Sequence, residues 1–234
     1  MTRLSQSSDG NTYFVESSGD LPRIFSAELG DVLSVFARDV VVEITLLGGA
    51  RPLRIIGRDG RIDGRRVQLR LNNLYGGQEK FVLVEVEVPA GTERDAFKLA
   101  SARCSYHNLL ASRDDWSEGD TAVSFSRRAS DVTASVNLTV QKDLLLNQIA
   151  EAKDEAIRQA DNGNRQEAAA TLKNVAFTVR EKAQAYNLQD EEVMKEAEQT
   201  LEYGDAVGRD GMDRRSRKAM RTDSYQKRNQ QMPR

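Results

Sequence analysis

The stretch Phe81-Val82-Leu83-Val84-Glu85-Val86-Glu87-Val88 (residues 81–88) is the clearest structural signal in this chain. Its valines at positions 82, 84, 86 and 88 point to one side of an extended backbone, and Glu85 and Glu87 point to the other. Pro89 and Gly91 end the run. This alternation predicts a strand with one buried face and one solvated face, which is typical of an antiparallel sheet.

The same type of pattern extends over residues 39–136, where short apolar runs alternate with turn residues such as Gly48-Gly49 and Gly76-Gly77. No helical period lies between these runs. We expect seven short strands, at residues 40–46, 53–56, 67–71, 81–88, 97–106, 121–125 and 131–136. Short strands at even spacing predict an antiparallel β-sandwich over residues 39–136.

The residues before this region predict a strand followed by a helix. Residues 12–16 form a short apolar run, and Asp20 is a favourable N-cap with Pro22 in the first helical turn. Apolar residues then recur at spacings of three and four from Leu21 to Phe36. This period predicts a helix over residues 20–36 with one buried face.

Residues 137–204 predict a helical hairpin within a three-helix segment. The helical period runs over 143–161, restarts after Gly163 and reaches about residue 184, with Asn164 and Glu167 in the spacing of a capping box. A third, acidic helix is expected over 189–203, closed by Gly204. The pair resembles one tetratricopeptide unit, but no second copy follows at a period near 34 residues.

Residues 205–234 are polar, basic and almost free of aliphatic side chains, which predicts a disordered tail. From residue 209 onward, nine Lys and Arg stand against three Asp, a net charge of +6, while the whole chain carries −2. The remainder therefore carries −8. We expect this tail to be solvated or to dock on acidic helices rather than to bind nucleic acid, because no aromatic residues suited to base stacking are interleaved with its cations.

The composition argues against catalysis and metal binding. His107 is the one histidine and Cys104 the one cysteine, and three residues apart on one strand their side chains point to opposite faces. A nucleophile–histidine pair and a Cys/His zinc site are therefore not expected, and we predict no enzyme activity, no catalytic residue and no cofactor. No apolar run approaches the length of a membrane span, and residues 1–10 do not form a signal peptide.

Two further motifs have ordinary explanations. Asp131-Val132-Thr133-Ala134-Ser135 has the form DxTxS, similar to the metal-ion-dependent adhesion motif DxSxS, but it lies where a sandwich strand is expected to meet a helix and not in the loop after a parallel strand. Asn137-Leu138-Thr139 matches a glycosylation sequon, which has a consequence only in a eukaryotic secretory pathway. We therefore expect no metal ligand among these residues.

Several stretches resemble bacterial von Willebrand factor A (VWA) domain proteins, a group often filed with calcium-activated chloride channel homologues. Residues 9–16, 20–25 and 28–35 are similar to the last strand and helix of the A domain, and residues 71–80, 84–89 and 217–221 to the segments that follow it. The resemblance implies that residues 1–38 are the C-terminal remnant of a truncated A domain. The family's metal residues precede the matched stretches, so no metal ligand is carried over. Relatives usually carry an export signal, which suggests a periplasmic or cell-surface location for full-length forms, whereas the compartment of this chain stays unknown.

Taken together, the sequence predicts a non-catalytic protein–protein interaction or scaffolding module. Its surfaces would be the sandwich strands and the helical hairpin, with Tyr75, Phe81, Phe97, Tyr106 and Trp116 as candidate contacts. The alternative is a helical adaptor in which residues 137–204 bind a partner and the sandwich supports them. The exposed A-domain remnant also predicts self-association.

Overall fold

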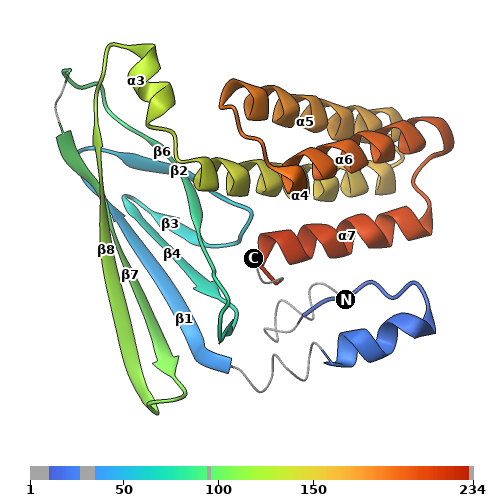
Figure 1. Ribbon diagram of the computed structural model, residues 1–234, viewed down its shortest axis with the longest axis horizontal. Helices are drawn as coiled ribbons and strands as arrows, with labels where there is room; N and C mark the ends of the chain where they lie inside the picture. The colour runs from blue at the N-terminus through green and yellow to red at the C-terminus, as the bar shows by residue number, and fades with distance from the viewer. Residues whose placement is uncertain (1–10, 27–34, 94–95, 232–234) are drawn as a thin grey trace. The chain divides into compact units, whose positions relative to one another are not determined.

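The computed structural model describes residues 11–26, 35–93 and 96–231. The described chain divides after Val132 into two compact units. We call the part up to Val132 the sheet unit and the part from Thr133 to Gln231 the helical unit, and describe each by itself (Figure 1).

The sheet unit contains two antiparallel sheets. The larger has six strands in the order β3-β4-β1-β7-β8, with β5 pairing with β1, and the smaller consists of β2 and β6. The strands are β1 (Val35–Leu46), β2 (Arg51–Ile56), β3 (Arg61–Asp63), β4 (Arg66–Leu71), β5 (Leu74–Tyr75), β6 (Leu83–Glu87), β7 (Ala96–Asn108) and β8 (Arg113–Ser124). This is the antiparallel arrangement that the period of two predicts.

Alternating residues of these strands form a common core. Val67, Leu69 and Leu71 of β4 are buried, and the residues between them are exposed. Ile55 of β2 and Val84 of β6 pack against the same cluster, so the small sheet covers part of one face of the large sheet. The opposite face of the large sheet carries polar side chains.

Three segments of the sheet unit differ from the sequence prediction. Residues 12–16 were expected as a strand but have no regular structure, and within the expected helix 20–36 the described residues form the end of a 3-10 helix, η1 (Ser18–Asp20), followed by helical residues 21–26. Residues 27–34 of that range lie outside the described residues. Val35 and Phe36 belong to β1 instead, because β1 continues past its apolar centre by pairing Val35 with Tyr75.

The predicted strand at residues 131–136 was also wrong, since Ala129–Ala134 form helix α3. The Asp131 carboxylate accepts hydrogen bonds from the Ser126 hydroxyl at 2.8 Å and from Arg128 Nε at 2.9 Å. These local bonds close the chain into a turn at the start of the helix. They compete with an extended backbone, as short polar side chains commonly do.

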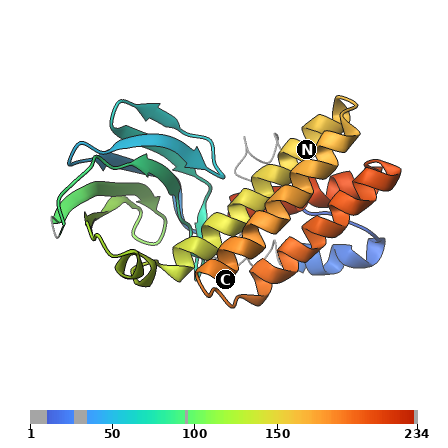
Figure 2. The same ribbon diagram turned by 90° about the horizontal axis from the view of Figure 1, so that it is seen from above.

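Four longer helices form the helical unit: α4 (Leu138–Asp161), α5 (Arg165–Ala185), α6 (Glu191–Asp210) and α7 (Arg214–Arg228). Figure 2 shows α4, α5 and α6 lying side by side. Asn137, Asp190 and Asp213 cap α4, α6 and α7 by accepting hydrogen bonds from backbone N–H groups. The core consists of two clusters, which include Leu145, Ile149 and Val179 in one and Ile157, Leu172 and Met220 in the other.

Helix α6 continues past the expected stop at Gly204. A Cβ at this position would lie 2.8 Å from Lys173 Cγ and 3.2 Å from the Ala169 carbonyl oxygen, both on α5. The glycine therefore allows a close helix–helix approach rather than ending the helix. The prediction that Gly204 ends the helix was wrong, because the glycine serves helix–helix packing.

The basic tail is not disordered over its described part, because α7 packs on α4. Met220 is buried in the second core cluster, and Ser224 Oγ donates a hydrogen bond to the Ala150 carbonyl at 3.0 Å. Arg217 pairs with Asp161 at 2.7 Å. Of the two expectations, a solvated tail or one docked on acidic helices, the described part follows the second, because its cations pair with acidic side chains of other helices.

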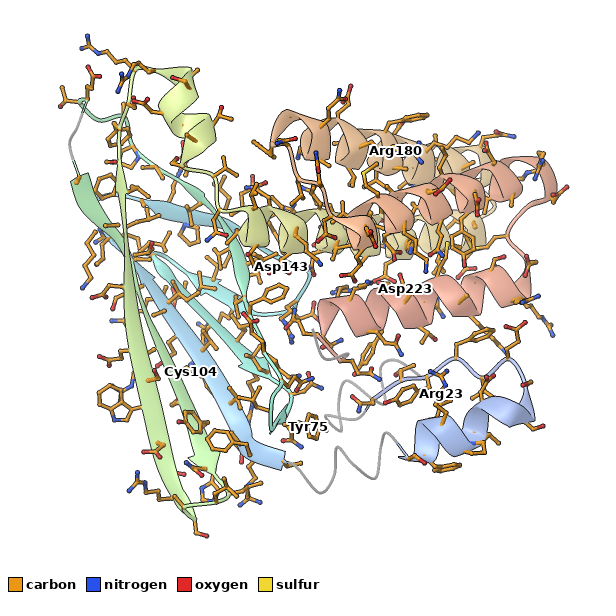
Figure 3. All side chains as sticks on the ribbon, viewed as in Figure 1. Arg23, Tyr75, Cys104, Asp143, Arg180 and Asp223 are labelled. Carbon is orange, nitrogen blue, oxygen red and sulfur yellow. The ribbon has the colours of Figure 1, made fainter. Side chains whose placement is uncertain are left out.

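A buried lysine joins three of these helices. Lys153 of α4 is 1% exposed and contacts Glu196 of α6 and, at 2.7 Å, Asp223 of α7, which Figure 3 labels. Burial disfavours the charged form of Lys153, but the two carboxylates outweigh this effect and raise its pKa above the usual value. The lysine therefore stays charged and fixes α7 to α4 and α6.

Replacing Lys153 by methionine should destabilise the helical unit. The substitution leaves the Glu196 and Asp223 carboxylates close together without their shared cation, which costs about 3–5 kcal/mol in the free energy of unfolding. Urea denaturation monitored by circular dichroism measures the effect. The matched control is Lys173→Met, which breaks the exposed pair with Asp205 and should have a much smaller effect, because solvent screens exposed ion pairs. Equal effects of the two substitutions would contradict the assigned role of Lys153.

Gly48→Ala should destabilise the sheet unit. Gly48 has φ +57°, and an added methyl group would overlap the Phe97 ring. Forcing an extra carbon into this contact costs about 1–3 kcal/mol. Gly77→Ala is the control, because Gly77 has φ +75° but no atom within 4 Å of the added methyl. The difference between their thermal midpoints isolates the contact with Phe97, and no difference would argue against it.

Candidate functional site

The candidate site lies on the polar face of the large sheet, along the hairpin of β7 and β8. Val42 of β1 faces Cys104 of β7, and both pack in the core. The neighbouring residues therefore point outward, with Arg103, Ser105 and His107 of β7 opposite Glu118, Trp116 and Asp114 of β8. This outward face of β7 and β8 is the surface described below (Figure 1).

Trp116 is the large apolar side chain at the centre of this surface, and it is 56% exposed. The guanidinium carbon of Arg103 lies 4.5 Å from the centroid of its ring. This distance allows a cation–π interaction, which holds the indole in one orientation without covering it. The result is an oriented aromatic ring presented to solvent.

Ion pairs between the two strands flank the tryptophan. Arg103 Nη1 lies 3.4 Å from Glu118 Oε1, and Lys98 Nζ lies 2.6 Å from Asp120 Oδ2. The hydrogen bond from Lys98, with a second from Ser101, lowers the pKa of Asp120. The two ion pairs fix the long side chains around Trp116.

The polar face continues across β1 and β4. Gln68 Nε2 donates to Glu43 Oε1 at 3.0 Å, and Arg70 Nη2 lies 3.0 Å from Asp39 Oδ1. Charges of both signs thus alternate over the face, as in protein surfaces that exclude wrong partners by charge.

His107 and Cys104 lie on opposite sides of β7. His107 Nδ1 is 2.8 Å from Asp114 Oδ1 on the outward face, whereas Cys104 packs with Val42 and Tyr106 in the core. Burial raises the pKa of the Cys104 thiol, which lowers its nucleophilicity at neutral pH. The two residues are not brought together.

The DxTxS stretch does not form a cation site in the structure. Asp131 is occupied by Ser126 and Arg128, and Thr133 lies in the same short helix α3. Within the described residues, no three His, Cys, Asp or Glu side chains gather closely enough to hold a metal ion. Asn137 serves as the N-cap of α4 by accepting a hydrogen bond from the Val140 N–H.

Of the five aromatic residues proposed from the sequence, Trp116 is exposed and the other four are partly buried. Phe97 stacks on Phe125 with 5.8 Å between ring centroids, and Tyr106 lies 6.0 Å from Phe36. Tyr75 and Phe81 are not on the outward surface formed by β7 and β8. Trp116 is therefore the exposed member of this set.

Sequence reasoning missed Arg103 and most of β8. Residues 113–120 show no apolar alternation, because β8 lies at the edge of the sheet and most of its residues are exposed on both faces. A usable signal was that a β-hairpin pairs residues at equal distances before and after its turn. A turn at residues 109–112 places Arg103 opposite Glu118 and beside Trp116.

Comparison with known proteins supports the fold class. No family model matches the chain. A structure described as a von Willebrand factor type A protein from Catenulispora acidiphila is similar with a TM-score of 0.56 and 13% identity, over 79% of this chain and 46% of that one. The ArnB paralog VWA2 from Sulfolobus acidocaldarius gives a TM-score of 0.47 and 12% identity, over 96% and 52% of the two chains.

One sequence relative is the E3 ubiquitin-protein ligase WAV3 of Arabidopsis thaliana, 30% identical over 93 residues. The match covers 37% of this chain and 12% of the relative. The chain thus spans about half the length of the similar structures and a small part of this relative.

The class that these findings define is a mixed α/β fold with an antiparallel sheet and several helices, similar to part of a VWA protein. At 13% identity, the likeness establishes the fold and not the activity. Among the described residues, no helix combines the length and the apolar character needed to cross a membrane.

Proposed function

We propose that this chain is a non-catalytic protein–protein interaction or scaffolding module, the C-terminal part of a VWA-type binding protein. The observation that carries the proposal is Trp116, which stands half exposed on the outward face of β7 and β8 with Arg103 against its ring. Tryptophan and arginine are the residues most enriched at the energetic centres of protein interfaces.

The shape and charge of the surface favour a protein partner. Its side chains come from one face of a sheet and bear both signs of charge in fixed pairs. A tryptophan surrounded by ordered polar groups matches the composition of an interface, with an aromatic centre and a polar rim. The likeness in fold to a VWA protein adds support, since residues 71–80 and 84–89 also resemble VWA proteins in sequence.

The arrangement of His107 and Cys104 supports the non-catalytic part of the proposal. His107 is engaged by Asp114 on the outward face, and the Cys104 thiol lies on the core side with a raised pKa. A nucleophile and its base must lie within hydrogen-bond reach of each other, and opposite faces of one strand prevent this.

Trp116→Ala should remove partner binding without unfolding the sheet unit, because the indole is on the outward face. The full chain, immobilised, is used to capture proteins from its source cells, and mass spectrometry compares wild type with variants. Partners of this surface should be lost with Trp116→Ala and retained with Leu53→Ala, which trims a half-exposed residue of β2. For a purified partner, we expect Kd to rise by about 30-fold, equivalent to a loss of ~2 kcal/mol.

Arg103→Ala provides a second test of the same surface. It removes the group that orients the indole and should raise Kd by a smaller factor, about fivefold. Identical partner sets for wild type, Trp116→Ala and Arg103→Ala would overturn the proposed surface.

Self-association through the N-terminal segment is a separate part of the proposal. Phe25, in the helical turn 21–26, is 69% exposed, and Val15 and Leu21 are also exposed. Exposed apolar side chains close together in sequence favour association. Phe25→Glu should therefore shift the sedimentation coefficient toward that of a monomer, whereas Leu110→Glu, at an even more exposed apolar position in the β7–β8 turn, should not. A wild-type chain that sediments as a monomer at micromolar concentration would contradict this part.

A helical adaptor is the second candidate, favoured by the exposure of Phe177 on α5 and Met194 on α6. In the capture experiment, an adaptor would lose its partners with Phe177→Ala and keep them with Trp116→Ala. The two variants lie in different units, so the result separates the two candidates.

A further inference from the structure

Strand β8 forms an edge of the large sheet. It pairs with β7 from Arg113 to Ser124, and no described strand pairs with its other side. In an antiparallel pair, alternate residues of an edge strand direct their N–H and C=O groups away from the neighbour. At about 3.3 Å per residue, β8 offers roughly 40 Å of backbone for a further strand.

The outward side chains of β8 are acidic around one aromatic residue. Asp114, Trp116, Glu118 and Asp120 follow each other at alternate positions. Each carboxylate has a partner on β7, but all three remain accessible, and the side chain of Asp114 is 92% exposed. A carboxylate accepts several hydrogen bonds, so each can take a second cation from the other side.

The opposite side chains of β8 leave room for an added strand. Ser117 and Thr121 are small, and a Cβ built on Gly119 would meet no atom within 4 Å. Nothing among the described residues covers this part of the strand. A partner backbone could therefore approach along β8 without a steric clash.

A second copy of β8 is a poor occupant of this edge. Antiparallel pairing centred on Ser117 places Asp114 opposite Asp120, and pairing centred on Trp116 places Asp114 opposite Glu118. Like charges directly opposite one another destabilise a sheet. Acidic side chains thus protect the edge from self-pairing, as charged residues do in natural edge strands.

From this pattern we propose that β8 binds an extended segment of a partner protein, with Lys or Arg at alternate positions and an aromatic residue opposite Trp116. The segment adds as an antiparallel strand, so that its backbone supplies affinity and its cations select the register. Cations would face Asp114, Glu118 and Asp120. The inference rests on the proposed function, because it specifies the chemistry of the partner at the same surface.

A synthetic peptide tests the inference directly. The probe is Thr-Lys-Thr-Lys-Thr-Tyr-Thr-Lys-Thr with blocked ends, in which the three lysines face Asp120, Glu118 and Asp114 and the tyrosine faces Trp116. Titration into the full ¹⁵N-labelled chain should shift the amide resonances of residues 113–124. The same peptide with glutamate in place of lysine should bind at least about tenfold more weakly, and added salt should reduce the difference.

A charge-reversing variant of β8 should reverse which of the two peptides binds more tightly. Glu118→Lys combined with Asp120→Lys should favour the glutamate peptide over the lysine peptide. Because these lysines face Arg103 and Lys98, the neutral pair Glu118→Gln with Asp120→Asn serves as a second variant, which should weaken the lysine peptide without strengthening the other. Thermal unfolding verifies that both variants are folded.

Backbone pairing has its own control. N-methylation of alternate peptide residues removes the N–H donors on one edge, so one of the two methylation frames should abolish binding and the other should preserve it. Equal binding of the lysine and glutamate peptides, equal effects of the two frames, or shifts outside β7 and β8 would each overturn the inference.

The result is distinguishable from failure of the proposed function. Loss of the captured partner with Trp116→Ala, together with no binding of the lysine peptide, would refute strand addition alone. Retention of the partner with Trp116→Ala, together with peptide binding at residues 113–124, would refute the Trp116 surface while supporting the edge.

Discussion

The alternation of side chains along β7 is the constraint on which the sheet unit and its candidate site depend. Because β7 pairs with β1 on one side and β8 on the other, its register fixes three strands at once. Cys104 and Tyr106 point into the core, so Arg103, Ser105 and His107 must point outward. A shift of one residue would exchange these sets and bury the guanidinium of Arg103. The same contacts that stabilise the core thus position the polar surface.

The side chains of this surface are held in place by contacts with one another and not by burial. Trp116 is half exposed, yet Arg103 lies against its ring and Glu118 holds Arg103. Single exposed ion pairs contribute little to stability. A row of them still restricts the conformations of long side chains, which reduces the entropy lost when a partner binds. The proposed interaction surface would thus lose little side-chain entropy on binding.

In the helical unit, ion pairs add to apolar packing where α7 attaches to its neighbours. Helix α7 has a low apolar content, and its attachment relies on Met220 together with ion pairs to Asp154, Asp161 and Lys153. Removal of charged groups from water is costly unless the groups are paired, and here the partners come from different helices. The position of α7 therefore depends on residues up to 74 positions away in sequence.

The sequence by itself determined the features that depend on local periodicity and turns. Alternating valines predicted an antiparallel sheet, and spacings of three and four with Gly163 predicted the α4–α5 hairpin, because strands and helices repeat side-chain direction with different periods. The features that depend on contacts between segments far apart in the sequence were decided only by the tertiary structure. The basic tail is helical and pairs with acidic side chains of α4. Gly204 lies within α6 at a close approach to α5 and does not end the helix. The polar run from Arg113 to Asp120 forms part of an edge strand. The tertiary structure also brought Arg103 to Trp116 across a hairpin. Charge pairing, close packing and edge position arise between segments, and the amino-acid pattern of one segment does not contain them.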